Sequence, residues 1–148
     1  MRSVPNEDAS SPLDIRMPAA QTMGVVFASA HSGTNYPDEF LAASRLNLMP
    51  LRRAEDSFLD ALFAAAPGTG APLLCARFPR AYVDPNREPY ELDPTMFAEP
   101  LPAYVNSASP RVAAGLGTIA RLVANGEEIY AGKLNFAEAC GRLERCYR

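Results

Sequence analysis

The sequence predicts an α/β fold in which helices pack on a mixed sheet. Two short apolar segments, 22–30 and 72–78, have the composition of buried strands. Two other segments, 51–66 and 136–147, repeat apolar residues at helical spacing. A strand, a helix and a second strand follow one another in this order, which favours helices packed against a sheet.

The N-terminal part divides into a polar leader and a strand. Residues 1–20 are polar and rich in proline, so we expect a flexible leader there. The apolar, β-branched run TMGVVFASA predicts a strand over 22–30. His31 follows at its carboxyl end, and ligands bind at that edge of open α/β sheets. A short helix is expected within 37–46.

The middle of the chain predicts a helix, a strand and a long connection. Over 51–66 a helix is expected, ended by the following Pro-Gly pair. Its apolar residues at helical spacing are Phe58, Leu59, Leu62 and Phe63. The strand over 72–78 is expected to continue in extended form over 81–83. The proline-rich segment 84–102 predicts a long loop, and long loops in compact domains are often functional.

The C-terminal part predicts one well-defined helix. Residues 115–123 favour a short strand or turn, and residues 130–134 favour a linker. The helix is expected over 136–147. The side chains that should face the core are Phe136, Ala139, Cys140 and Leu143.

Composition limits the class of protein. The net charge of -3 excludes a general nucleic-acid binder, because no basic face is available to neutralise phosphates. No apolar stretch approaches the ~20 residues that a membrane span requires, and the first residues do not resemble a signal peptide. The three cysteines, Cys75, Cys140 and Cys146, lack a CxxC spacing, so we expect reduced thiols. A soluble cytoplasmic protein whose partners are small molecules or proteins is therefore expected.

Three positions are candidates for metal binding. His31 is the only histidine, and its place between a strand and Ser-Gly exposes a ring of the type that most often binds zinc. The alternative is a structural or surface histidine. Glu55 and Asp56 lie near the start of the predicted helix, where acidic side chains also favour the helix dipole. Asp56 would share a helix face with Asp60, and a carboxylate there could reach a metal held by His31.

A cluster of arginines predicts anion recognition. Arg77, Arg80 and Arg87 lie close to Asp84 and Asn86 in a short segment. Guanidinium groups bind carboxylates in pairs of hydrogen bonds, and the asparagine adds a directed donor. The expected target is a carboxylate on a small substrate, with Asp84 orienting one of the arginines. The alternative is a salt-bridged turn.

Arg111 could line the same cleft, together with the glycine-rich turn over 115–117. That turn is no dinucleotide fingerprint, because the third glycine and the strand-turn-helix context are missing. A Ser-His-Asp set and a nucleophile elbow are also missing from the sequence.

Four blocks in order resemble the N-formylglutamate amidohydrolase family over about residues 22–148. They are ASAHSGTNYP (28–37), LRRAEDSFLDALF (51–63), ARFPRAYVDPNREPYELDPTMF (76–97) and SPRVAAGLGTIARLVANGEEIY (109–130). The resemblance assigns residues 21–148 to the N-terminal portion of such a domain. It implies a partial three-layer α/β/α mixed-sheet fold resembling that of zinc carboxypeptidases and aspartoacylases. It also implies zinc-dependent hydrolysis of an N-acyl amino acid, N-formyl-L-glutamate giving formate and glutamate in histidine degradation.

By this resemblance, zinc would be bound by His31 and by one carboxylate of the Glu55-Asp56 pair, and we prefer Asp56. Zinc would lower the pKa of its bound water to about 7 and so supply the nucleophile. Arg80 would be catalytic, because it could polarise the scissile carbonyl and hold its developing oxyanion. Asn86 and Arg87 resemble a pair that grips the substrate carboxylate. Arg77 and Arg111 are further substrate-binding candidates, from the arginine cluster and the cleft described above and not from the resemblance.

The sequence also departs from the family. Family members are longer, and a catalytic zinc normally has three protein ligands, whereas this chain offers two and has no second histidine. We therefore expect a truncated domain with little or no activity alone. Its sheet would lack strands, leaving an apolar edge that invites self-association. The alternative is a non-catalytic protein that binds a carboxylate ligand or a partner chain.

Overall fold

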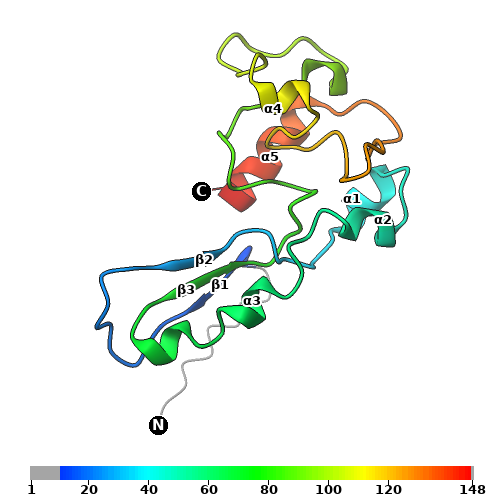
Figure 1. Cartoon of the computed structure of the whole chain (residues 1–148). Helices are drawn as coiled ribbons and strands as arrows, with labels where there is room; N and C mark the ends of the chain where they lie inside the picture. Colours follow the sequence, from blue (N-terminus) through cyan, green and yellow to red (C-terminus); the bar gives the residue numbers. More distant parts are fainter. Residues whose placement is uncertain (1–10, 148) are drawn as a thin grey trace.

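The computed structural model describes residues 11–147, and these form two regions (Figure 1). The sheet region contains β1 (Leu13–Arg16), β2 (Phe27–Ser29), α3 (Leu59–Leu62), the 3-10 helix η1 (Ala66–Thr69) and β3 (Leu73–Ala76). The helical region contains α1 (Asp38–Ala43), α2 (Leu48–Arg52), the 3-10 helix η2 (Pro94–Met96), α4 (Pro110–Ala113) and α5 (Phe136–Tyr147). The predicted α/β class is therefore confirmed.

The three strands form one mixed sheet in the order β1-β3-β2. β2 runs parallel to β3, with Phe27 opposite Leu73, and β1 runs antiparallel to it, with Asp14 opposite Cys75. β3 lies inside the strand predicted over 72–78. The strand predicted over 22–30 shortens to β2, because the backbone N–H groups of residues 22–23 donate to the carbonyl of Gly70 in a turn.

The flexible leader predicted over residues 1–20 contains a strand in its described part. β1 forms there, because its backbone groups pair with the edge of β3. The pairing continues beyond the strand, where the N–H of Arg77 donates to the carbonyl of Pro12 over 2.9 Å. The first ten residues of the predicted leader lie outside the described residues.

The prediction of one continuous helix over 51–66 is also wrong. The backbone N–H of Asp56 donates to the carbonyl of His31 over 3.0 Å, so it is used in a tertiary contact instead of a helix. Phe58 then takes a left-handed conformation with φ of 66°, which an α-helix does not accommodate. The chain resumes as α3, and Phe58 and Leu62 are 78% and 76% exposed instead of facing the core. Phe63 does pack inward, with its ring 5.4 Å from that of Phe27.

The C-terminal helix is confirmed with the predicted bounds, 136–147. Its inward face buries Ala139 and Leu143, as expected, while Cys140 is only half-buried. Arg142 is fully buried on the same face, which the apolar pattern did not predict. Its guanidinium lies 4.6 Å from the centre of the Tyr82 ring and donates to the hydroxyl of Tyr130 over 2.7 Å.

The other connections contain more order than predicted. α1 confirms the short helix expected within 37–46. The long loop predicted over 84–102 contains η2, and residues 115–123 form turns with one bridge from Leu122 to Glu128. The predicted linker over 130–134 is tied to the core, because Tyr130 and Leu134 are buried and each forms a β-bridge.

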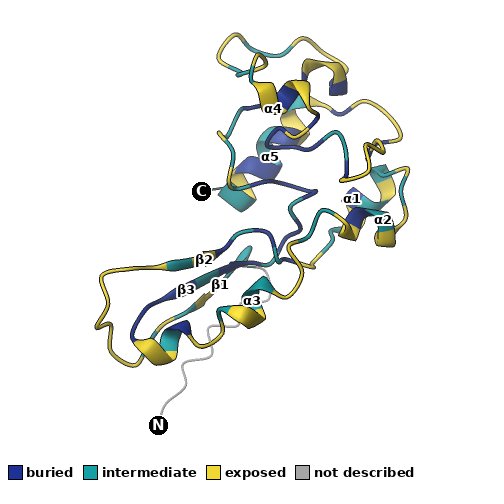
Figure 2. Cartoon of the chain, in the orientation of Figure 1, coloured by how far each residue is buried: buried dark blue, intermediate teal, exposed yellow. Residues whose placement is uncertain are grey.

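The two regions differ in how many apolar side chains they bury (Figure 2). One large cluster of buried apolar residues occupies the helical region, whereas the sheet region has a small cluster of Ala66, Leu73 and Cys75. Strand alternation places Ile15, Ala28 and Leu74 on the other face of the sheet. No helix of the described residues covers that face in Figure 1.

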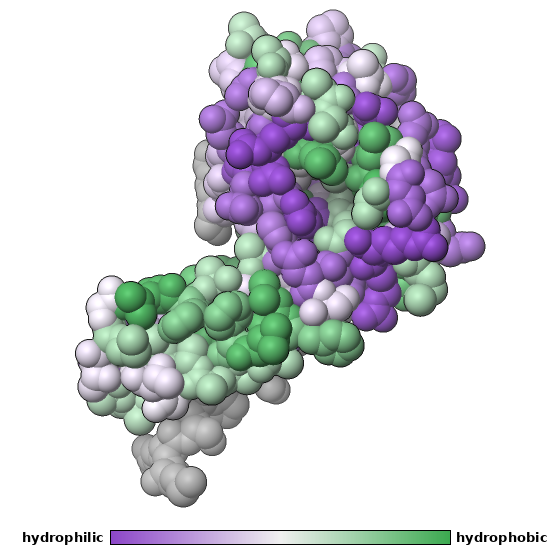
Figure 3. All heavy atoms as spheres, viewed as in Figure 1, coloured by the Kyte–Doolittle hydropathy of each residue, from purple (hydrophilic) through white to green (hydrophobic). Residues whose placement is uncertain are grey.

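That open face is apolar. Exposed hydrophobic side chains gather over the sheet region in Figure 3, while polar groups dominate the surface of the helical region. The exposed residues of the sheet region include Ile15, Met17, Met23, Val25, Val26, Phe58 and Leu62. Within residues 11–147, no helix combines the length and apolarity needed to cross a membrane. The three cysteines are free thiols, and Cys75 is buried.

Candidate metal and substrate site

Four predicted site side chains meet where the two regions join. His31 lies two residues after β2, and Arg80 and Asp84 follow β3, so all three come from the carboxyl ends of parallel strands. This is the edge at which open α/β sheets bind ligands. Asp56 reaches the same place from the connection between α2 and α3, where its N–H is bonded to the carbonyl of His31.

The His31 ring is buried between two carboxylates. Its Nε2 lies 2.9 Å from Oδ1 of Asp84, and its Nδ1 lies 3.1 Å from Oδ2 of Asp56. A neutral imidazole that donates from Nε2 to Asp84 presents a lone pair at Nδ1 to a second acceptor, the Asp56 carboxylate. Two acceptors at this distance repel, so a proton or a metal cation belongs between them.

Asp84 forms hydrogen bonds with several groups of the site. Besides His31, its carboxylate accepts from the backbone N–H of Asn86 over 2.9 Å and from Nε of Arg80 over 3.0 Å. Burial acts to raise the pKa of Asp84, but the hydrogen bond and charge of His31, the Asn86 N–H and Arg80 together hold it below its usual value. Asp84 is therefore a fixed anion that orients both the imidazole and a guanidinium.

The structure separates the two members of the Glu55-Asp56 pair. Asp56 directs its half-exposed carboxylate to His31, whereas the Glu55 side chain is 2% exposed and accepts from the Tyr36 hydroxyl over 2.8 Å. Burial raises the pKa of Tyr36, and the hydrogen bond to Glu55 raises it further. Arg52 forms an ion pair with Glu55 at 3.2 Å. Glu55 is thus neither in a solvated first helical turn nor directed at His31, and Asp56 shares no helix with Asp60.

A cavity of about 240 Å³ opens beside these groups. Asp56, Arg80 and Asp84 line it together with Arg53, Glu55 and apolar residues of the 116–124 segment, whereas His31 is not among its lining residues. The Arg80 guanidinium is anchored at Nε by Asp84, and its terminal nitrogen lies 3.9 Å from Asp56. An anchored cation at the wall of a small cavity can hold a carbonyl oxygen or a carboxylate.

The other predicted arginines do not line this cavity. Arg77 lines two different cavities, and Arg111 is 59% exposed with its guanidinium 3.8 Å from Glu91. Arg87 donates to the backbone carbonyls of Asn86 and Leu116 and lies 3.7 Å from Asp84. The alternative of a salt-bridged turn therefore describes part of this cluster, since Arg80 and Arg87 both pair with Asp84.

Sequence reasoning missed two features of the site. It paired Asp84 with an arginine but not with His31, although both residues follow candidate strands, which was the available signal. It also did not explain Gly33. A Cβ at Gly33 would lie 2.1 Å from the carbonyl oxygen of Phe78, so only glycine lets the His31 loop pack against the chain that carries Arg80.

Comparison with known proteins gives the same lineage as the four sequence blocks. The family model described as N-formylglutamate amidohydrolase matches residues 23–148. The chain belongs to the N-formylglutamate amidohydrolase family. Its structure is similar to the crystal structure of N-formylglutamate amidohydrolase from Ralstonia eutropha JMP134, with a TM-score of 0.85 and 36% sequence identity over 93% of this chain.

The chain spans about half of that related structure, 48% of its length. None of the curated proteins compared with the chain matches it significantly. Within residues 11–147, no group of three or more histidine, cysteine, aspartate or glutamate side chains is arranged to hold a metal ion. The family is therefore established for this chain. The structure adds a small mixed sheet with His31, Asp56 and Asp84 in contact at its edge.

Proposed function

We propose that the chain supplies one part of a zinc-dependent N-formylglutamate amidohydrolase site. The substrate would be an N-acyl amino acid, N-formyl-L-glutamate in the first instance, hydrolysed to formate and glutamate. The fold would be a portion of the three-layer fold of zinc carboxypeptidases and aspartoacylases. Family membership and the similarity to a structure with that activity in its name support this proposal.

The observation that carries the proposal is the position of His31 between two carboxylates. Histidines that bind zinc almost always donate their second ring N–H to a carboxylate or carbonyl, which fixes the tautomer. Asp84 is placed for that role at Nε2, and this leaves Nδ1 directed towards Asp56. In this proposal His31 Nδ1 and Asp56 are zinc ligands, and Asp84 orients the ring.

The donor set of this chain fits two of the three protein ligands of a catalytic zinc. His31 is the only histidine of the sequence, so a second histidine ligand would come from another polypeptide segment. Zinc, when bound, would supply Lewis acidity and an activated water. We favour Asp56 over Glu55 because the Glu55 carboxylate is occupied by Tyr36 and Arg52.

The substrate-binding roles follow from the same geometry. Arg80 lines the cavity and is held at Nε by Asp84, so its terminal nitrogens would stabilise negative charge on the carbonyl oxygen. We keep the prediction that Asn86 and Arg87 bind the substrate carboxylate. Arg87 would first have to give up its hydrogen bonds to two backbone carbonyls. Arg77 and Arg111 would bind substrate only with a change in their present positions.

The test is zinc affinity measured on the full chain by calorimetry, together with formate release from N-formyl-L-glutamate. His31→Ala should abolish zinc binding, and Asp84→Asn should weaken it about 10- to 100-fold, because the ring loses its orienting acceptor. Asp56→Asn should also abolish binding, whereas Glu55→Gln is the matched control and should leave the affinity unchanged. Equal effects of the Asp56 and Glu55 variants would contradict the ligand assignment.

Activity separates the two functions proposed for this chain. Zinc binding without formate release would support a metal-binding part of a site that another segment completes. Formate release by the chain alone would show that two protein ligands suffice. If the chain binds no zinc and only a carboxylate ligand, the non-catalytic alternative holds and the proposal fails.

A further inference from the structure

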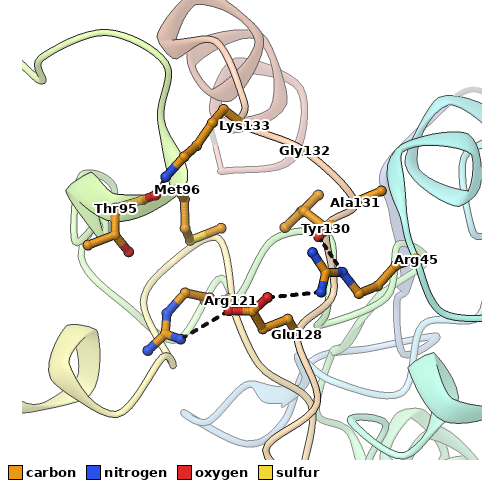
Figure 4. Close-up of a pocket in the computed structure, with 9 residues that line it drawn as sticks. All are labelled: Arg45, Thr95, Met96, Arg121, Glu128, Tyr130, Ala131, Gly132 and Lys133. Carbon is orange, nitrogen blue, oxygen red and sulfur yellow. Dashed lines mark hydrogen bonds and ion pairs between the residues drawn. The ribbon is translucent and has the colours of Figure 1, made fainter.

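A second cavity lies in the helical region, and its walls carry positive charge (Figure 4). Its volume of about 320 Å³ is within the range of small-molecule sites. The cations that line it are Arg45, Arg121 and Lys133, and Glu128 is the acidic lining residue. It is distinct from the candidate zinc site, because Arg121 faces it while the neighbouring Ala120 and Leu122 line the other cavity.

Both guanidinium groups of this cavity are anchored through Nε. Arg121 donates from Nε to the carboxylate of Asp93 over 2.8 Å, and Asp93 is itself buried and held by Thr95. Arg45 donates from Nε to the backbone carbonyl of Tyr130, also over 2.8 Å. An arginine fixed in this way keeps its terminal nitrogens in place, so little conformational entropy is lost when they bind an anion.

The terminal nitrogens of the two arginines meet at the carboxylate of Glu128. One oxygen of Glu128 lies 3.1 Å from Arg45 and the other lies 3.9 Å from Arg121. Figure 4 shows the carboxylate between the two guanidinium groups. Half of the Glu128 side chain is exposed, and ion pairs of such exposure contribute little to stability. The chain's own carboxylate therefore occupies a two-arginine site from which it is easily displaced.

We propose that this cavity binds a small carboxylate anion and that Glu128 competes with the ligand for Arg45 and Arg121. The ligand carboxylate takes the place that the Glu128 carboxylate now occupies, with the planar geometry that guanidinium groups match. Glu128 then turns to solvent. Met96 and Tyr130 supply an apolar wall for the remainder of the ligand, and Lys133 adds a further cation.

The test is calorimetric titration of glutarate into the full chain and its variants. Glu128→Gln keeps the shape of the side chain but removes its charge, so the affinity for glutarate should rise about fivefold. Glu127→Gln is the matched control. It removes the same charge from the neighbouring residue, which pairs with Arg53 at 3.4 Å and does not line this cavity. The control should leave the affinity unchanged.

Arg45→Gln, checked for folding by circular dichroism, should reduce the affinity for glutarate at least tenfold. Lys133→Gln provides a second loss-of-charge variant on an exposed residue and should reduce it less. The proposal is overturned if wild-type chain and Glu128→Gln both fail to bind glutarate. It is also overturned if the Glu127 and Glu128 variants raise the affinity equally, since net charge alone would then be responsible.

Discussion

The sheet region and the helical region bury side chains to very different extents. In the helical region one continuous cluster includes Phe40, Tyr82 and Leu92, and a buried arginine lies among its aromatic rings. In the sheet region the strands bury one face against α3 and η1 and expose apolar side chains on the other. Stability of the chain should therefore reside mainly in the helical region, and the site at their junction depends on both.

The strongest test of this comparison is the same substitution in each region. Leu92→Ala in the helical region should lower the free energy of unfolding by about 4 kcal/mol, because a fully enclosed cavity results. Leu73→Ala, equally buried in the sheet region, should cost about 2 kcal/mol, because its small cluster can collapse around the smaller side chain. Urea denaturation measures both. Equal losses would contradict the difference between the regions.

Arg142 tests whether a buried charge stabilises the helical region. Its guanidinium stacks on Tyr82 and pairs with Glu138 at 2.6 Å, so Arg142→Ala should cost roughly 3 kcal/mol in unfolding free energy. Arg145→Ala is the control on the same helix, where the side chain is exposed and pairs with Glu39. The control should change stability by less than about 1 kcal/mol. A similar effect of both substitutions would show that burial of Arg142 contributes nothing.

Asp93 introduces a pH dependence into the stability of the helical region. Burial acts to raise the pKa of Asp93, but hydrogen bonds from Thr95 and the Arg121 guanidinium hold it below its usual value. Because the folded-state pKa is lower than the unfolded value of about 3.9, this stabilisation is complete above about pH 4. It is lost as the pH falls through the folded pKa.

Asp93→Asn should therefore cost about 2 kcal/mol at neutral pH and much less at low pH. Asp14→Asn is the matched change in the sheet region, where the carboxylate pairs with Arg16 in a partly exposed contact. It should change stability by less than about 1 kcal/mol. Thermal unfolding of both variants across the acidic range measures the contrast, and parallel pH profiles would refute it.

The smallest effect on stability is expected on the open face of the sheet. Ile15→Thr and Val26→Thr replace side chains that are 55% and 57% exposed, so unfolding should change by less than about 0.5 kcal/mol. Self-association of the chain, which we expect through this sheet, should nevertheless decrease. Met49→Thr in the helical region is the control, and it should leave the association state unchanged in sedimentation experiments. No change with the sheet variants would refute association through this face.

Local patterns predicted some elements well. The helix over 136–147 was predicted with its bounds, because its apolar residues recur at helical spacing and pack on one core. The strand over 72–78 was predicted because its composition alone suits a buried strand. The continuous helix predicted over 51–66 does not form, because a hydrogen bond from the Asp56 N–H to the His31 carbonyl competes with it. Local propensity contains no information on that contact.

The strand in the predicted leader also depends on a tertiary contact that local propensity does not predict. Residues 13–16 have weak strand character alone and become β1 only because the edge of β3 offers unpaired backbone groups. The candidate site was likewise predictable only in part. The position of His31 after a strand was predictable, whereas the direction of the Glu55 and Asp56 side chains depends on how the broken helix turns.

The sequence by itself determined the family, because four blocks in order are specific, and the family match over residues 23–148 confirms it. It also determined the C-terminal helix and the place of His31 at a strand end. Only the tertiary structure decided that Asp84 meets His31, which lies 53 positions away in the chain. Contacts over such separations depend on strand pairing and packing, and spacing along one sequence cannot specify them. For the same reason, only the fold places Glu128 between two arginines.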